Sequence, residues 1–226
     1  MEITEILMRF WPLLLQGFET TMILAAAGFL LGFLIGIPIA LGETYAPRSI
    51  RWLAISYVEL IRGTPMLVQV FIIYYALPQV GIKFDAMTAA ILGLGLNSGA
   101  YQAEYFRGSI KSIPSGQMEA ALSVGMRLTQ AIFSVILPQS LRLVIPAWTN
   151  EVVYLVQYSS VAYLVTVVEL TAVGGIIGVR TFQYVAIYSI IALIYLAITL
   201  AITKTTRRVE LRYAIPGLSS SRSFRL

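Results

Sequence analysis

The chain has 226 residues and contains no cysteine and no histidine. Without cysteine it can form neither a disulfide framework nor a thiolate metal site. Without histidine it lacks the commonest metal ligand and the side chain that most often acts as a base near neutral pH. These two absences disfavour metalloenzymes and hydrolases that use a serine–histidine pair.

Charged residues are also scarce, at 12% of the chain, whereas soluble domains carry roughly 25%. Hydrophobic residues make up 58%, and the mean hydropathy is +0.81. This composition indicates an integral membrane protein. The formal net charge of +5 does not indicate nucleic acid, because the basic residues stand beside apolar runs, as the positive-inside rule predicts for membrane proteins.

Five apolar segments approach or exceed the roughly 20 residues that a helix needs to cross a bilayer. They predict an all-α transmembrane domain over residues 17–207. Residues 1–16 are expected to form a short extracytoplasmic helix at the membrane interface, and residues 208–226 a cytoplasmic tail with a disordered Ser-rich end. The expected spans are 20–42, 52–77, 86–103, 141–167 and 181–203.

Helix breakers occur inside two of these spans. Gly63-Thr64-Pro65 interrupts the second span near its middle, and Pro146 predicts a kink in the fourth. Broken backbone at membrane depth is tolerated only against protein or water, so the second span should not be a plain lipid-facing helix. Glu59 and Arg62 stand three residues apart on one helix face and are expected to pair.

Glycines mark two further features. We expect residues 164–180 to form an extracytoplasmic connection with a short helix, broken at Gly174-Gly175 and Gly178. In the first span, glycines recur every fourth residue and leave a smooth face on which another helix can pack closely. These are Gly28, Gly32 and Gly36.

Lysine and arginine predict the orientation of the chain. If the amino terminus is outside, the cytoplasmic segments hold eleven of these residues and the outer segments hold three. The positive-inside rule therefore predicts an extracytoplasmic amino terminus and a cytoplasmic carboxyl terminus in the cell membrane. The loop over residues 108–138 then lies in the cytoplasm.

Residues 119–138 of that loop read EAALSVGMRLTQAIFSVILP. Glu119-Ala120-Ala121 is followed after three residues by Gly125 and after nine more by Val135-x-Leu137-Pro138. The pattern resembles the cytoplasmic loop signature of the membrane subunits of binding-protein-dependent ABC importers, with valine where isoleucine is usual. The alternative is an ordinary amphipathic loop helix that ends at a glycine.

Local chemistry suits a compact docking helix in this loop. Ser115 is expected to cap its amino end, Glu119 lies near the positive end of the helix dipole, and Gly125 supplies a left-handed stop. Ala120 and Ala121 leave little bulk, so a partner surface can approach. The resemblance implies that Glu119, Ala120, Ala121 and Gly125 couple the chain to an ATPase subunit.

Two other stretches extend the resemblance to the branch of this family that takes up polar or charged amino acids. Residues 59–71 read ELIRGTPMLVQVF, and RGTP followed by LVQ is similar to that branch. Asn150-Glu151 and Ser159-Ser160 also match it. Gln157-Tyr158 stand where a Lys-Asp pair is common, which leaves the charge preference for the substrate open.

Polar residues near the middle of three different spans predict one cavity. Thr64, Asn97 and Glu151 each lie about halfway along a span, and Glu151 would suit the ammonium group of an amino acid. Asn97 could instead join helices, and Glu151 could instead pair with an arginine or bond across a dimer. The predicted substrate-binding residues are Thr64, Asn97, Glu151, Gln157 and Ser160, and no metal or cofactor site is expected.

The resemblance implies a type I ABC importer fold with five transmembrane helices and a cytoplasmic coupling helix. Its expected partners are ATPase subunits that bind ATP and magnesium, a second permease subunit, an extracytoplasmic binding protein and membrane lipid, but no nucleic acid. The sequence has no GxxxxGK[ST] phosphate loop, so the chain itself is not expected to be an enzyme. The alternatives are a self-contained secondary amino-acid carrier or channel, for which no internal repeat is found, and a non-transporting membrane anchor.

Overall fold

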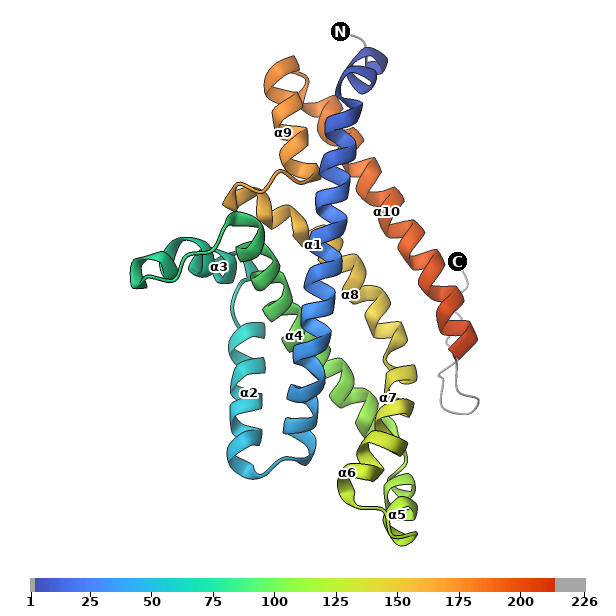
Figure 1. The fold of residues 1–226 in the computed structure, drawn as a ribbon. Coiled ribbons are helices and arrows are strands. Elements are labelled where there is room, and N and C mark those ends of the chain that lie inside the picture. Colours follow the sequence, from blue (N-terminus) through green and yellow to red (C-terminus); the bar gives the residue numbers. More distant parts are fainter. Residues whose placement is uncertain (1–2, 214–226) are drawn as a thin grey trace.

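The structure is a computed structural model that describes residues 3–213, and these residues form helices and short connections without a strand (Figure 1). The prediction of an all-α protein is confirmed. The elements are α1 (Ile3–Tyr45), α2 (Arg48–Arg62), α3 (Met66–Phe71), η1 (Ile72–Ala76), η2 (Leu77–Val80), α4 (Ala86–Ser112), α5 (Ser115–Ser123), α6 (Leu128–Ala131), η3 (Ile132–Ile136), α7 (Leu137–Leu143), α8 (Ile145–Tyr158), η4 (Ser159–Val165), α9 (Leu170–Thr181) and α10 (Tyr184–Tyr213).

Two helices, α1 and α10, are each long and apolar enough to cross a membrane. Two bent helix pairs raise the number to four if each counts as one broken span: 48–62 with 66–80, and 128–143 with 145–165. The 27 residues of α4 extend over roughly 40 Å, which is also enough to cross. Polar residues and glycines make α4 less apolar than α1 and α10. It can carry them because α1, α2 and α8 pack around it.

The glycine face of α1 packs against α4, as the spacing predicted. A Cβ atom added at Gly32 would lie 2.5 Å from Ser98 Oγ, and one added at Gly36 would lie 2.9 Å from Gln102 Cβ. The two backbones therefore approach closely along a central pair of helices. Buried residues of α3 and α8 complete the core around this pair, among them Val70, Leu155 and Val156.

The amino-terminal segment corrects one prediction. Instead of a separate interfacial helix followed by a span, α1 runs unbroken from Ile3 to Tyr45. Its first turns bury Ile6, Phe10 and Leu14 against apolar residues of α9 and α10. This packing explains why the helix continues, because the apolar face of the first turns is covered by protein and has no need to lie along the membrane surface.

Both predicted breaks occur, and the first bends the chain more sharply than the second. The helices on either side of Gly63-Thr64-Pro65 meet at a bend of 102°, and those on either side of residue 144, just before Pro146, meet at 56°. The predicted pairing of Glu59 with Arg62 is wrong. Arg62 Nη1 lies 3.5 Å from Glu104 Oε2 on α4, because the end of α2 faces α4.

The predicted extracytoplasmic helix forms as α9, but its glycines do not break it. Instead they admit aromatic side chains of α10, since a Cβ atom at Gly178 would lie 2.7 Å from Tyr184 Cδ1. Glu169 caps the helix, accepting hydrogen bonds from the backbone nitrogens of Thr171 and Ala172 at 2.9 Å. Helix α10 begins at residue 184, three residues later than the predicted span.

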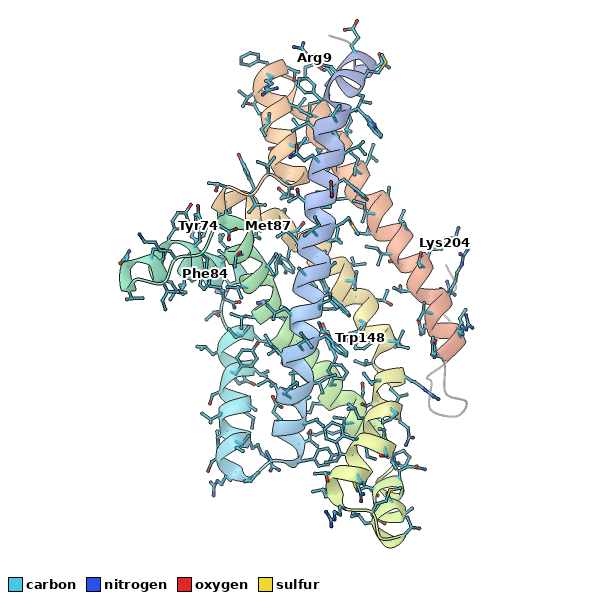
Figure 2. All side chains as sticks on the ribbon, viewed as in Figure 1. Arg9, Tyr74, Phe84, Met87, Trp148 and Lys204 are labelled. Atoms are coloured by element: carbon cyan, nitrogen blue, oxygen red, sulfur yellow. The ribbon has the colours of Figure 1, made fainter. Side chains whose placement is uncertain are left out.

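Figure 1 shows the turn between α1 and α2 and helix α5 at the end of the molecule opposite the amino terminus, whereas α10, which carries Lys204, stops short of that end (Figure 2). Two of the basic segments expected in the cytoplasm, the turn between α1 and α2 and the loop around α5, thus lie at one end, and the orientation in a membrane stays a prediction. Helix α10 includes the first residues of the predicted tail, 208–213, and the Ser-rich end lies outside the described residues.

Candidate functional site

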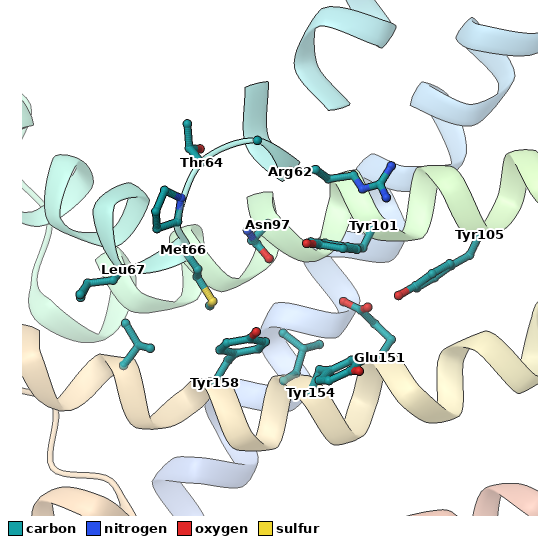
Figure 3. A pocket seen from close by; sticks show the side chains of 14 residues that line it. Arg62, Thr64, Met66, Leu67, Asn97, Tyr101, Tyr105, Glu151, Tyr154 and Tyr158 are labelled. Carbon is teal, nitrogen blue, oxygen red and sulfur yellow. The ribbon is translucent and has the colours of Figure 1, made fainter. Parts of the chain in front are cut away.

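A cavity of about 670 Å³ lies between the break after α2, helix α4 and helix α8 (Figure 3). It contains three of the five residues predicted to bind substrate, which are brought together from positions up to 87 residues apart in the chain: Thr64, Asn97 and Glu151. The cavity is lined by Arg62, Gly63, Thr64, Pro65, Met66, Leu67, Asn97, Tyr101, Tyr105, Glu151, Tyr154, Leu155, Tyr158 and Val161.

Glu151 is buried, with 4% of its surface exposed. Ser98 Oγ donates a hydrogen bond of 2.6 Å to Glu151 Oε1, and the Tyr105 hydroxyl points toward the same carboxylate (Figure 3). Neither Arg62 nor Arg142 pairs with Glu151, and no other ion pair within residues 3–213 includes it. The Glu151 carboxylate therefore lies at the cavity wall, where neutral hydrogen-bond donors hold it and no cation does.

Arg62 brings a positive charge to the same cavity. Its guanidinium carbon lies 5.2 Å from the centre of the Tyr101 ring, in addition to the contact with Glu104. Glu104 in turn accepts two hydrogen bonds of 2.6 Å from Arg107, whose Nε lies 3.2 Å from Glu43 Oε2 on α1. This chain of charges joins α1, α2 and α4 beside the cavity, so much of the charge on Arg62 is balanced by protein.

Four tyrosines line the cavity, and the sequence analysis did not identify them. Tyr101 and Tyr105 lie on α4, and Tyr154 and Tyr158 lie on α8 (Figure 3). Each pair is four residues apart, so both members lie on one helix face. Pairs of tyrosines four residues apart, beside polar residues in two apolar spans, were the sequence signal that could have predicted this part of the cavity wall.

The sequence analysis also missed Gln69, which lies on α3, just after the break between α2 and α3. Its Nε2 lies 2.7 Å from the Ile61 carbonyl oxygen and 3.1 Å from that of Thr64, and its Oε1 accepts a hydrogen bond of 3.1 Å from Asn97. Gln69 therefore joins the break to α4. Asn97 both contacts another helix through this bond and lines the cavity, so the two interpretations left open by the sequence hold together.

Two predicted substrate-binding residues do not reach the cavity. Gln157 is exposed, and Ser160 donates its hydroxyl to the Gln157 carbonyl oxygen at 2.7 Å. The helical period explains the placement of Gln157, because 100° per residue puts positions three, four and seven after Glu151 on the cavity side. Gln157, six positions after it, falls on the other side, and Ser160 lies beyond the end of α8, in η4, where its hydroxyl turns back to the backbone.

The predicted coupling residues lie on and just after α5. Glu119 and Ala120 are exposed and Ala121 is buried. Gly125 has φ of +87°, so the predicted left-handed stop is confirmed. Its neighbour Met126 donates its backbone nitrogen to the Ala121 carbonyl oxygen at 3.1 Å, which closes the end of the helix.

The amino end of α5 differs from the prediction, because Pro114 is the capping residue and no side chain caps the helix. Ser115 is already the first helical residue. Large apolar side chains stand exposed around the far end of α5, which is unusual for a surface without a partner. They are Leu122, Val124, Met126 and Leu128.

No group of three or more metal-ligating side chains comes together within residues 3–213.

Comparison with known proteins identifies the family. The model of the family described as "Binding-protein-dependent transport system inner membrane component" matches residues 28–215. The chain is 38% identical to "Probable amino-acid ABC transporter permease protein YckA" of Bacillus subtilis, with 93% of each chain covered. It is 36% identical to "Glutamine transport system permease protein GlnP" of Escherichia coli, with 90% of this chain and 94% of that one covered.

A solved structure gives the same result. "Crystal structure of an amino acid ABC transporter with histidines" has a chain that superimposes with a TM-score of 0.86 and 36% identity, covering 94% of this chain and 99% of that one. The MetNI methionine ABC transporter superimposes with a TM-score of 0.79 at 21% identity, which supports the fold alone. The type I importer fold expected from the sequence is confirmed.

These matches favour the ATP-driven importer over the secondary carrier and confirm the resemblance that rested on the 119–138 loop. The matched segment takes in the broken second span, the cavity and α5, so family and site refer to the same part of the molecule. The chain belongs to the family of binding-protein-dependent transport system inner membrane components.

Proposed function

We propose that this chain is the membrane permease subunit of an ABC importer and that its cavity carries a polar or charged amino acid across the membrane. The observation that carries the proposal is the meeting of Thr64, Asn97 and Glu151 in one cavity of about 670 Å³. That volume lies within the 300 to 1,000 Å³ of ordinary small-molecule sites. The names of YckA and GlnP, which refer to amino-acid and glutamine transport, support this cargo class.

The charges in the cavity suit an amino acid. A carboxylate in mid-membrane costs about 2.5 to 3.5 kcal/mol by insertion scales, and Glu151 has no cation partner within the described residues to offset this. The ammonium group of the cargo would supply one. Arg62 offers a cation for the cargo carboxylate, and the tyrosines supply hydroxyls and ring faces that can meet a polar or cationic side chain.

Transport needs partners that this chain does not supply. Two ATPase subunits would bind ATP and magnesium and dock at α5, where Glu119 and Ala120 are exposed. A second permease subunit, of the same or a sister sequence, would complete the pathway. A binding protein on the outer face would deliver the cargo. In this arrangement the chain is a multi-pass inner-membrane protein with its amino terminus outside.

The proposal is tested by expressing the chain with the ATPase and binding-protein genes of its own system and reconstituting the purified complex in proteoliposomes. We expect the ATPase to copurify with the chain. Labelled amino acid should enter the vesicles only when ATP is present on the side of the membrane where the ATPase lies. The control is an ATPase variant with its phosphate-loop lysine replaced. Uptake by the permease alone, driven by an ion gradient, would instead establish the secondary carrier.

A further inference from the structure

Gln69 is buried just behind the cavity wall and is not among the residues that line the cavity. Its exposed fraction is 9%, and it lies on α3 four residues after Pro65. A buried amide must have its polar atoms bonded, or it destabilises the fold. The partners of Gln69 therefore reveal what it holds in place.

All partners of the amide nitrogen are oxygens of the break between α2 and α3. Nε2 lies 2.7 Å from the Ile61 carbonyl oxygen, 3.1 Å from the Thr64 carbonyl oxygen and 2.9 Å from Thr64 Oγ1. The end of a helix leaves carbonyl groups without an intrahelical partner. The two N–H groups of Gln69 are shared among these oxygens and hold the break against α3.

This arrangement determines which way the Gln69 amide is turned. If the amide were rotated by half a turn, Oε1 would face the carbonyl oxygens of Ile61 and Thr64, and attraction would become repulsion. Oε1 is therefore directed at α4. There it accepts a hydrogen bond of 3.1 Å from Asn97 Nδ2.

The Asn97 amide is turned in consequence. Its nitrogen is directed to Gln69, so its oxygen points into the cavity (Figure 3). Asn97 Oδ1 has no hydrogen-bond partner within the described part of the chain. The cavity wall at Asn97 thus offers an acceptor, as does the carboxylate of Glu151.

We propose that Gln69 is a positioning residue that turns the Asn97 amide oxygen toward the cavity, so that this wall selects cargo groups that donate hydrogen bonds. The inference rests on the proposed function, because it takes the cavity to be the cargo site. Gln69 does not touch the cargo. It acts from behind the wall, by the chain of bonds from the carbonyls of the break to Asn97.

The test measures cargo binding to the purified permease–ATPase complex in lipid nanodiscs, without binding protein. The probes are labelled L-glutamine, L-histidine, L-arginine and L-glutamate, because the last has the shape of glutamine but no donor on its side chain. In Gln69→Met the Asn97 amide is free to turn. We expect the ratio of glutamine to glutamate affinity to fall by about tenfold, the effect of one hydrogen bond.

A second variant separates orientation from structural support. Gln69→Glu loses the donors that satisfy the break but keeps an oxygen that accepts from Asn97 Nδ2, so overall affinity should fall while the ratio is kept or rises. Gln16→Met is the matched control, because Gln16 is exposed on α1 and its side chain makes no hydrogen bond within the described residues. It should leave both quantities unchanged.

The outcomes are distinct for the two proposals. An unchanged ratio in Gln69→Met, or an equal fall in Gln69→Met and Gln69→Glu, would show that Gln69 only supports the fold and would overturn the inference. If Gln69→Met does not assemble, Gln69→Glu decides the question, because a lower ratio of glutamine to glutamate affinity in that variant would contradict the inference. If the wild-type complex binds none of the four amino acids, the proposed function fails as well.

Discussion

Glu151 is a carboxylate on the cavity wall, held there by a hydroxyl and not by a cation. Ser98 donates a hydrogen bond of 2.6 Å to it, and burial leaves 4% of the residue exposed. Arg62 faces the same cavity but is engaged by Glu104 at 3.5 Å. The charge of Glu151 is therefore the one that a cargo ammonium group can meet most directly.

Replacing that carboxylate tests the role of the charge. Glu151→Gln keeps the size of the side chain and an oxygen for Ser98, so the variant should assemble with its ATPase and hydrolyse ATP. We expect its apparent affinity for cargo to fall by about 10- to 100-fold, or its cargo preference to change, because a charge-assisted hydrogen bond contributes about 1.5–3 kcal/mol. The measurement is uptake kinetics for a panel of labelled amino acids.

Glu59→Gln is the matched control, because Glu59 is exposed on α2 and does not line the cavity. It should transport like the wild type. Unaltered kinetics and preference in Glu151→Gln for every amino acid in the panel would remove Glu151 from the set of cargo ligands.

At the scale of elements, α1 and α4 form the central pair because glycines let them approach closely. At Gly36 the neighbour is partly backbone, since an added Cβ atom would lie 3.1 Å from the Ala103 nitrogen as well as 2.9 Å from Gln102 Cβ. Backbone cannot rotate away as a side chain can. The close contact of these two helices therefore depends on the absence of a methyl group.

Gly36→Ala should destabilise the protein. Overpacking costs about 1–3 kcal/mol, which exceeds the roughly 1 kcal/mol that alanine contributes over glycine within a helix. Gly108→Ala is the control on α4, because an added Cβ atom there meets nothing within 4 Å. Thermal unfolding in detergent should show a lower transition temperature for the first variant and an equal or higher one for the second. Equal transitions would contradict the packing account.

Helix α5 is the second element with a clear consequence. Its exposed Glu119 and the stop at Gly125 are expected to place it against an ATPase subunit. Glu119→Lys reverses a charge at the predicted contact. Gly125→Val forces a β-branched residue into φ of +87° and should distort the end of the helix. Both variants should insert normally but lose ATPase copurification and transport.

Gly81→Val controls for the backbone strain alone. Gly81 has φ of +90° and open space around it, and it lies in the turn after η2, far from α5 in the chain. It should still copurify with the ATPase. Normal uptake by Glu119→Lys and Gly125→Val would show that α5 is an ordinary surface helix.

At the scale of the whole molecule, the helical bundle and its short connections take up residues 3–213. The bundle offers a cavity of about 670 Å³, but a dilute cargo must first be captured and brought to it. A separate binding protein would do this. The chain alone is expected to be one part of an assembly with cargo capture outside and ATP hydrolysis inside.

The assembly should therefore hydrolyse ATP in response to loaded binding protein rather than to free cargo. We expect strong stimulation of the reconstituted complex by binding protein with bound amino acid, and little by the amino acid alone. The assay is phosphate release from nanodisc-embedded complex, with empty binding protein as control. Full stimulation by free amino acid would count decisively against this arrangement.

The sequence by itself determined the features that depend on local chemistry. Gly63-Thr64-Pro65 predicted a break, Pro146 a kink and Gly125 a left-handed stop, because proline and glycine restrict or free the backbone wherever they stand. The glycine spacing on α1 predicted a packing face, and the 119–138 loop indicated the family. Each of these signals lies within one continuous stretch of at most 20 residues.

Only the tertiary structure decided which distant residues meet. Asn97 bonds to Gln69 across 28 residues and Ser98 to Glu151 across 53, and Arg62 pairs with Glu104 and not with Glu59. The tyrosines line the cavity and Gln157 does not, because of how far α4 and α8 are rotated about their axes. That rotation depends on close packing summed over all the helices, so no short stretch of sequence contains it.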